Sequence, residues 1–203
     1  MFKKLLVTVA ATVLAFSAVP SSGQAATLTA LSDNFNTETL SLNYNSFANW
    51  NVSNGTVDLI GPGFFALCGG TRCVDMDGST ANAGDLTTKD NFAIGSYALS
   101  FRIAGNQRGG AADGMVVTFG DLNELFVRNP FDPFGLVQRT VNLAALDFLT
   151  FSHNGGDNIG ILLDDVTIRQ LSVIPLPAAL PLYGAGLAVM GFIGWRRKMK
   201  NKN

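Results

Sequence analysis

Two acidic stretches contain the side chains best suited to bind a cation. Asp75 and Asp77 stand two residues apart just before a glycine, and Asp164 and Asp165 are adjacent in an apolar run. Carboxylates at such spacing suit Ca²⁺, although the Glu that completes an EF-hand loop is missing. Strand alternation would turn one of Asp164 and Asp165 inward, where it needs either a calcium ion or backbone amides as its partner. If the first and last strands of the domain adjoin, Asp33 joins this candidate calcium set.

The sequence offers little for catalysis. His153 is the single histidine, and its Gly-rich surroundings indicate a solvated loop residue. There is no G-x-S-x-G nucleophile elbow, so a Ser-His-Asp or Cys-His constellation would depend on His153 alone. A glycosidase needs a facing pair of carboxylates, and neither Glu38 nor Glu124 is marked as a member of such a pair. We therefore predict no catalytic residue, with a carbohydrate-active enzyme using Asp and Glu as the alternative.

The two cysteines, Cys68 and Cys73, enclose four residues, two of which are glycines. A loop of this composition bends easily, and a disulfide is the usual state of such a pair outside the cytoplasm. A metal site would require more ligands than one histidine and two cysteines supply. The sequence therefore predicts a structural Cys68–Cys73 disulfide.

Charge is distributed unevenly along the 203 residues. All 15 acidic residues lie between Thr27 and Ile174, where 7 of the 14 basic residues also lie, so this region carries about 7 − 15 = −8. The other basic residues are at the two ends, at Lys3, Lys4, Arg196, Arg197, Lys198, Lys200 and Lys202. An acidic middle region excludes nucleic acid as a partner, because nucleic-acid binding requires basic patches.

The first 26 residues have the pattern of a signal peptide. Two lysines precede an apolar run from Leu5 to Val19, and small residues ending at Ala26 follow. This order of regions is typical of a segment that signal peptidase removes. We therefore expect residues 27–170 to be an exported domain.

Residues 27–170 show short apolar or alternating runs separated by Gly, Asn and Asp, which indicate an all-β domain. The spacing predicts a two-sheet antiparallel sandwich, jelly-roll-like, with Trp50, Phe101, Phe119 and Phe151 in its core. Asn54-Gly55 predicts a hairpin between the expected strands Ala48–Val52 and Thr56–Ile60. Phenylalanines at 64–65 and 131–134 would either plug the sandwich or offer a stacking surface. The expected strands are Tyr97–Ile103, Met115–Phe119, Leu136–Leu143, Phe148–Phe151 and Ile159–Ile168, together with the pair Ala48–Val52 and Thr56–Ile60.

Residues 171–203 have a different composition. Pro175 and Pro177 cannot pair in a central strand, which indicates an extended linker. The 17 residues from Ala179 to Trp195 carry no charge, and a basic cluster follows at once. These features predict a short transmembrane helix with a cytoplasmic basic tail and an exported domain on the other side of the membrane.

This C-terminal pattern resembles the PEP-CTERM protein-sorting signal of Gram-negative bacteria, in its VPLPA-type variant with Ile174 in place of Val. The resemblance implies a sorting motif recognised by an exosortase, a transient inner-membrane anchor at Leu180–Trp195, and a basic stop signal. The Pro-Glu-Pro of the commoner form is absent. The sorting motif would be Pro175, Leu176, Pro177 and Ala178, and the stop signal Arg196, Arg197 and Lys198.

The exported domain is similar to bacterial carbohydrate-binding jelly rolls, in which a structural calcium commonly lies near an Asp of the last strand. Together the two resemblances imply a non-enzymatic protein of the cell surface or the extracellular (biofilm) matrix that binds or organises exopolysaccharide. Signal peptidase and an exosortase would process it. A self-associating surface protein with no glycan ligand is the remaining alternative.

Overall fold

The computed structural model describes residues 28–171 and 179–200, which form eleven strands and one helix. The strands all lie in the first of these two ranges, as the sequence indicated for an all-β domain. Their bounds are β1 (Leu28–Asp33), β2 (Trp50–Ser53), β3 (Asp58–Ile60), β4 (Cys73–Asp75), β5 (Asp85–Thr88), β6 (Gly95–Ala104), β7 (Asp113–Phe119), β8 (Leu122–Arg128), β9 (Gly135–Leu143), β10 (Thr150–His153) and β11 (Leu162–Leu171).

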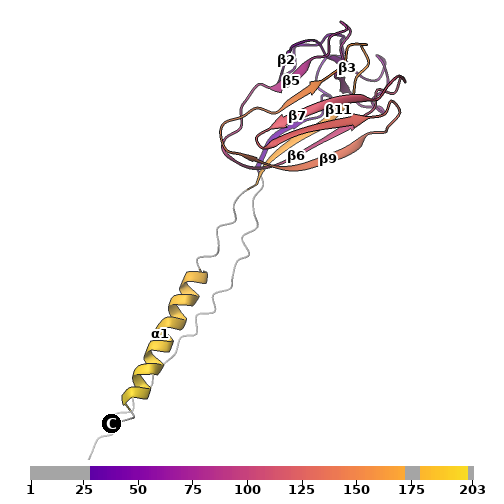
Figure 1. The fold of residues 1–203 in the computed structure, drawn as a ribbon. Helices are drawn as coiled ribbons and strands as arrows, with labels where there is room; N and C mark the ends of the chain where they lie inside the picture. Colours follow the sequence, from indigo (N-terminus) through magenta and orange to yellow (C-terminus); the bar gives the residue numbers. More distant parts are fainter. Residues whose placement is uncertain (1–27, 172–178, 201–203) are drawn as a thin grey trace, which may run out of the picture. The chain divides into compact units, whose positions relative to one another are not determined.

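The strands form two antiparallel sheets that pack face to face (Figure 1). The six-stranded sheet has the order β3-β4-β11-β6-β9, and β1 pairs with the second half of β11. The five-stranded sheet has the order β2-β5-β10-β7-β8. This arrangement confirms the predicted two-sheet sandwich. It also places Asp33 of β1 opposite Val166 of β11, so the first and last strands adjoin as expected.

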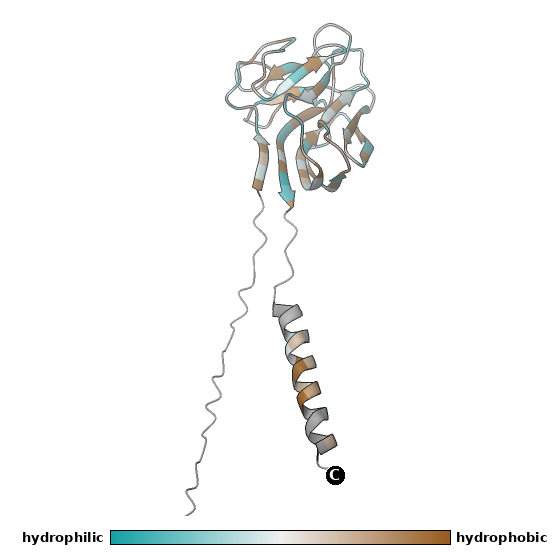
Figure 2. Ribbon diagram, turned by 90° about the vertical axis from the view of Figure 1, so that its left-hand side faces the viewer, coloured by the Kyte–Doolittle hydropathy of each residue, from teal (hydrophilic) through white to brown (hydrophobic). Residues whose placement is uncertain are grey.

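The core lies between the sheets because each long strand alternates buried and less buried side chains, and Figure 2 shows hydrophobic and hydrophilic positions interleaved along the strands. Trp50, Phe101, Phe119 and Phe151 are fully buried, which confirms their predicted core role. Phe151 contacts both Trp50 and Phe101, with ring centroids 5.8 and 5.2 Å apart. Aromatic pairs at these separations stabilise a core beyond the area that they bury.

The predicted hairpin at Asn54-Gly55 is wrong. β2 pairs with β5 in one sheet and β3 pairs with β4 in the other, so the turn carries the chain between sheets. Gly55 lies against the backbone of Asn82 and Ala83, where an added Cβ would come within 2.4 Å of a carbonyl oxygen. The neighbouring Thr56 N–H donates to the Asn82 carbonyl at 2.9 Å. Close backbone packing, and not a two-residue hairpin, is the reason for glycine here.

One open edge of the sandwich is closed by a salt bridge between the sheets. Arg139 of β9 donates two hydrogen bonds to Glu124 of β8, at 2.7 and 2.5 Å. Its guanidinium also lies 5.3 Å from the ring centre of Phe126, also in β8. Planar guanidinium groups suit this combined pairing and stacking. Arg139 and Glu124 are therefore engaged with each other across the edge.

A second, smaller apolar cluster lies on the outer face of the six-stranded sheet, the face turned away from the core. Ile60, Ala104 and Leu162 of this sheet contact a loop, residues 61–72, that folds over them. The Cys68–Cys73 disulfide, with an S–S distance of 2.03 Å, belongs to the same cluster and confirms the predicted pairing. The disulfide thus fixes a loop that covers one end of this outer face.

The helix α1 (Ala179–Lys200) contains the basic residues Arg196, Arg197 and Lys198. In the part of the chain that the structure describes, no helix combines the length and apolar character needed to cross a membrane. The predicted transmembrane helix is therefore not supported. Only 17 uncharged residues of the helix precede Arg196, and four of them are glycines, whereas a span needs about 20 apolar residues. The signal peptide (residues 1–26) and the sorting motif (residues 175–178) lie outside the described residues.

Candidate functional site

The five aspartates of the candidate calcium set lie at three places in the sandwich. At the first, Asp33 is the last residue of β1 and contacts the residues just after β1 and at the start of β2. Its two carboxylate oxygens accept hydrogen bonds from the Phe35 N–H, the Asn49 amide and the Trp50 indole, each at 2.9 Å. Asp33 is thus a structural acceptor with both oxygens in use.

At the second place, Asp75 and Asp77 hold the loop that precedes β11. Asp75 accepts the N–H groups of Asp77 and Gly160 with one oxygen and forms an ion pair with Arg108 through the other. Burial raises the pKa of Asp75 to about 7, although Arg108 acts in the opposite direction. Asp77, which is fully buried, accepts three consecutive N–H groups of residues 156–158 through Oδ2, at 2.8 to 3.1 Å.

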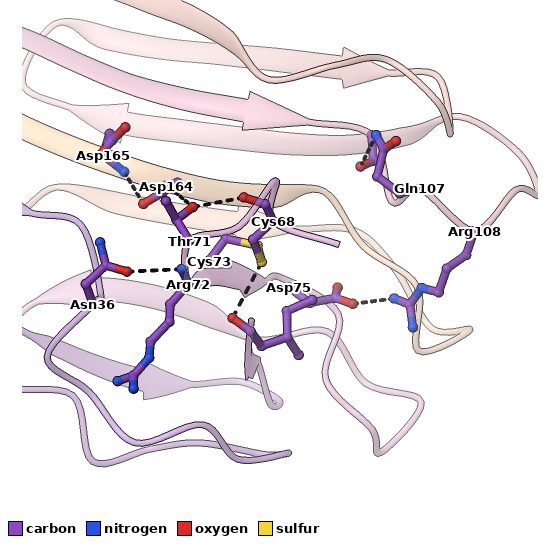
Figure 3. Close-up of a disulfide and its surroundings, with 12 residues drawn as sticks. Asn36, Cys68, Thr71, Arg72, Cys73, Asp75, Gln107, Arg108, Asp164 and Asp165 are labelled. Carbon is purple, nitrogen blue, oxygen red and sulfur yellow. Dashed lines mark hydrogen bonds and ion pairs between the residues drawn. A yellow bond between two sulfur atoms is a disulfide. The ribbon is translucent and has the colours of Figure 1, made fainter. Parts of the chain in front are cut away.

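At the third place, a β-bulge in β11 separates Asp164 from Asp165. Asp165 has a positive φ of 51°, and the register with β6 shifts between Asp164 and Thr167. Asp164 is buried beneath the disulfide loop, where it accepts the Asp165 N–H at 2.7 Å and the Thr71 hydroxyl at 3.2 Å (Figure 3). Asp165 is half-buried and lies 3.4 Å from Arg102. One carboxylate, that of Asp164, is therefore buried, as alternation predicted. It lies beneath the disulfide loop on the outer face of the sheet, and not in the core between the sheets.

The calcium site stays a prediction. Within residues 28–171 and 179–200, no three His, Cys, Asp or Glu side chains are grouped so that they could hold a metal ion. Calcium takes six to eight oxygen ligands, and both Asp164 oxygens already accept hydrogen bonds from protein groups. The alternative of backbone amide partners describes one of the two contacts of Asp164, the Asp165 N–H, and the Thr71 hydroxyl supplies the other.

Metal removal tests the calcium hypothesis. A structural ion at Asp164 and Asp165 predicts that EDTA lowers the melting temperature of the purified chain and that added calcium restores it, because a ligand bound only to the folded state stabilises it. Differential scanning calorimetry measures this directly. A melting temperature that EDTA leaves unchanged would remove calcium from the site.

The histidine and the glutamates that an enzyme could use have structural partners, although Nδ1 of His153 has no hydrogen-bond partner among the described residues. His153 is buried at the end of β10, not solvated as predicted, and its Nε2 accepts the Ile161 N–H at 3.3 Å. Burial lowers the pKa of His153, against the opposing effect of Asp113, Asp77 and Asp157. Glu38 is also buried and accepts hydrogen bonds from the Ala48 N–H and the Tyr44 hydroxyl. With Glu124 paired to Arg139, both glutamates have structural partners.

The two phenylalanine-rich loops each divide their aromatic side chains between two roles. Phe64 and Phe134 pack against the apolar cluster on the outer face, and Phe134 also lies 5.4 Å from the Arg102 guanidinium. Phe65 and Phe131 are instead 52% and 70% exposed. The backbone of Phe65 has a positive φ of 54°, which is uncommon for a bulky residue and often marks a functional position. The loops therefore cover part of the outer face with Phe64 and Phe134, and do not plug the core between the sheets, while Phe65 and Phe131 present aromatic surface.

A polar groove of about 440 Å³ lies on the same outer face, formed by β6, β9 and β11. The small side chains of Ala98 and Ser100 form its floor in the middle of β6. Gln138 and Thr140 of β9 flank the floor on one side, and Arg169 of β11 flanks it on the other, as their strand registers require. The groove is thus lined by hydroxyl, amide and guanidinium groups, and its lining contains no carboxylate.

A second hollow, of about 520 Å³, lies between β1 and residues 88–93. Most of its polar side chains already form hydrogen bonds with other groups of the domain. Lys89 donates to the Phe47 carbonyl at 2.5 Å, Asn49 donates to Asp33, and the Tyr97 hydroxyl donates to the Ala93 carbonyl. Fewer polar groups are therefore free to receive a ligand here than in the groove over β6.

Comparisons with known proteins identify a similar architecture but no family. No family model and no curated protein matches the chain. Among solved structures, it resembles the K3 cleaved adhesin domain of Lys-gingipain from Porphyromonas gingivalis, with 17% identity, a TM-score of 0.49, and coverage of 71% of this chain and 99% of that one. It also resembles the CBM22-1 xylan-binding domain from Paenibacillus barcinonensis Xyn10C, with 13% identity, a TM-score of 0.45, and coverage of 73% and 98%. At these identities and TM-scores, neither likeness decides what this chain binds.

The buried Asp164 gives the domain a testable pH dependence. Burial raises its pKa to about 6 from an ordinary value of 3.8, so the folded state keeps the proton to higher pH than the unfolded state. The resulting stabilisation is complete below about pH 4 and is lost as the pH rises through 6. In an Asp164→Asn variant the side-chain oxygen can still accept the Asp165 N–H and the NH2 group can donate to the Thr71 hydroxyl oxygen, and the side chain does not ionise. We expect it to be more stable than the wild type by about 1–3 kcal/mol at pH 7.5, and equally stable at pH 4.

Urea unfolding between pH 4 and 8, with EDTA present throughout, measures this difference. Asp75 retains its own pH dependence in both proteins, so the comparison between them isolates Asp164. Two curves that stay parallel over this range would contradict the assignment.

Proposed function

We propose that the β domain binds a polysaccharide in the groove on the outer face of the six-stranded sheet and does not cleave it. The observation that carries this proposal is the set of side chains in the groove. Ala98 and Ser100 leave room for a ligand, and Gln138, Thr140 and Arg169 surround that room with hydrogen-bonding groups. Sugars carry many hydroxyl groups that both donate and accept hydrogen bonds, so such a lining suits them.

The outer face of β6, which continues beyond the groove in both directions, suits a chain-like ligand. The outward positions of β6 from Ser96 to Arg102 extend over roughly 20 Å, at about 3.3 Å per residue. The disulfide loop bounds this face near Ala104 and Leu162, where its residues pack in the outer apolar cluster. The exposed Phe65 on that loop offers a flat apolar surface against which a sugar ring can pack. An extended polymer fits these features better than a compact small molecule.

The positions of the acidic side chains support binding without cleavage. Hydrolysis of a glycoside requires two carboxyl groups on either side of the scissile bond. The groove lining contains no carboxylate, and Glu38 and Glu124 are held by structural partners. The contacts of these residues thus support a binding protein over the carbohydrate-active enzyme that the sequence left open.

The proposed location is the cell surface or the extracellular matrix. A Cys68–Cys73 disulfide is typical of proteins that fold in an oxidising compartment. The signal-peptide pattern of residues 1–26 and the PEP-CTERM-like pattern of residues 174–198 support export followed by exosortase-dependent sorting. On this proposal the bound polymer is exopolysaccharide, and a calcium ion at Asp164 and Asp165 remains a subsidiary hypothesis.

A pair of matched variants tests the groove. Ser100 lies mid-strand on the outer face of β6, and Ser152 has the equivalent place on β10 of the other sheet, with similar exposure. We expect Ser100→Ile to fill the groove and weaken polysaccharide binding by about tenfold or more, because the bulky side chain excludes the ligand from its hydrogen-bonding groups. Ser152→Ile should bind as the wild type does.

The measurement is affinity electrophoresis of the purified full chain through gels that contain a panel of polysaccharides, with release of reducing ends assayed on the same polymers. Equal retardation of all three proteins by a polymer that binds would place the ligand elsewhere. Sustained release of reducing ends would overturn the non-enzymatic assignment, and no retardation by any polymer would favour a self-associating protein.

A second experiment tests the sorting signal. Replacing both prolines of the motif, in the variant Pro175→Ala/Pro177→Ala, should leave the protein with its C-terminal segment unprocessed, since the processing enzyme would lose its recognition motif. Mass spectrometry of the exported protein supplies the readout. A normal mature mass in the double variant would exclude processing at this motif.

A further inference from the structure

We infer that the polymer bound in this groove is anionic and carries carboxylate groups, as polyuronates do. This inference rests on the proposed function and makes it more specific. Three features carry it, namely an exposed arginine without an acidic partner, the balanced charges around it, and the acidity of the rest of the domain.

The first feature is Arg169 itself. Its side chain is exposed, and within the described residues it forms no ion pair, whereas Arg102, Arg108 and Arg139 each face a carboxylate. Its strand neighbours are Ala98 of β6 and Thr29 of β1. These short side chains leave the guanidinium accessible at the margin of the groove. A planar guanidinium can donate two parallel hydrogen bonds to one carboxylate, which a neutral sugar cannot match.

The second feature is the charge balance around the groove. Arg102 lies beside the half-buried Asp165, and Arg139 forms an ion pair with Glu124. Asp164, whose pKa burial raises to about 6, is largely ionised at neutral pH. Its strand partner is Arg102, whereas Arg169 pairs with Ala98 four positions along β6, so the charge of Asp164 lies about 13 Å away at about 3.3 Å per residue, beyond the screening length. The two ion pairs cancel, so Arg169 gives the groove an excess of positive charge. A neutral polymer would gain nothing from this excess.

The third feature is the contrast with the whole domain, which carries about 7 − 15 = −8 over the region from Thr27 to Ile174. A polyanion is repelled by most of such a surface. Charges further apart than about 10 Å are largely screened at 0.1 M salt, so a ligand in the groove experiences mainly the local arginine. Repulsion elsewhere would then direct a polyanion to this one face.

The test compares two polymers that differ in a single group. Polygalacturonate carries a carboxylate on every residue, and its carboxyl-reduced form has the same backbone without the charge. We expect the purified full chain to bind polygalacturonate more tightly by tenfold or more. Arg169→Gln should remove about tenfold or more of the affinity for polygalacturonate, the loss of one charge-assisted pair. The reduced polymer can lose only a neutral hydrogen bond to Arg169, so its binding should weaken by a much smaller factor.

Two further variants control for charge and geometry. Thr118→Glu lowers the net charge by the same one unit on the outer face of the five-stranded sheet, and it should bind polygalacturonate as the wild type does. Arg169→Lys keeps the charge without the planar fork and should retain part of the affinity. Thermal melting confirms that each variant is folded, which is expected because Arg169 and Thr118 lie on outer faces.

The outcomes separate this inference from the proposed function. If wild type binds both polymers equally and Ser100→Ile abolishes both, the groove binds glycans but the inference is wrong. Equal losses in Arg169→Gln and Thr118→Glu would show a general charge effect and also overturn it. If dextran sulfate binds through Arg169 and polygalacturonate does not, the anionic group is a sulfate and the carboxylate assignment is wrong. No binding to any of these polymers would remove the proposed function together with the inference.

Discussion

The architecture of this domain depends on buried carboxylates that accept backbone N–H groups from its connecting segments. Asp58 holds the amides of Asn43 and Ser79, Asp77 holds three consecutive amides, and Asp33 holds the bend after β1. Irregular segments cannot satisfy their own N–H groups as a sheet does, and an unpaired buried group is costly. Several donors converging on one carboxylate satisfy those groups and also offset the cost of burying the charge. The unusual acidity of the domain therefore has a structural origin, as well as consequences for its ligands.

The same principle shapes the outer face of the six-stranded sheet. Asp164 is drawn under the disulfide loop by the Thr71 hydroxyl, and the bulge at Asp165 makes this possible without turning the rest of β11 over. One end of the face is thereby covered by an apolar cluster, and the other end, over Ala98 and Ser100, stays open. The disulfide loop therefore forms a boundary at one end of the polar groove over Ala98 and Ser100. Because the acids of this region are paired or buried, the open strip retains the positive character of Arg169.

The fold was more predictable from the sequence than the site. Strands such as β6 and β9 alternate strongly over nine or ten residues, and their ranges were anticipated closely. Short strands with weak alternation, β1, β5 and β8, gave little signal. Asn54-Gly55 predicted a hairpin because local turn chemistry does not reveal which sheet receives the next strand. Alternation in β11 could not reveal a bulge, and so did not show which of Asp164 and Asp165 is buried or that it lies beneath the loop on the outer face. Arg169 stands out because it forms no ion pair within the described residues. The sequence could not show this, because it does not reveal which side chains the neighbouring strands place beside Arg169.

The central claim is that a polysaccharide occupies the outer face over β6, β9 and β11. The most direct test is a nuclear magnetic resonance titration of the isotope-labelled full chain with oligogalacturonides, following backbone amides and the side-chain amide of Gln138. The account predicts saturable shifts at Ser100, Gln138 and Arg169, with Thr87 and Thr150 on the opposite sheet unaffected. Shifts confined to the five-stranded sheet, or to the hollow beside Lys89, would contradict it.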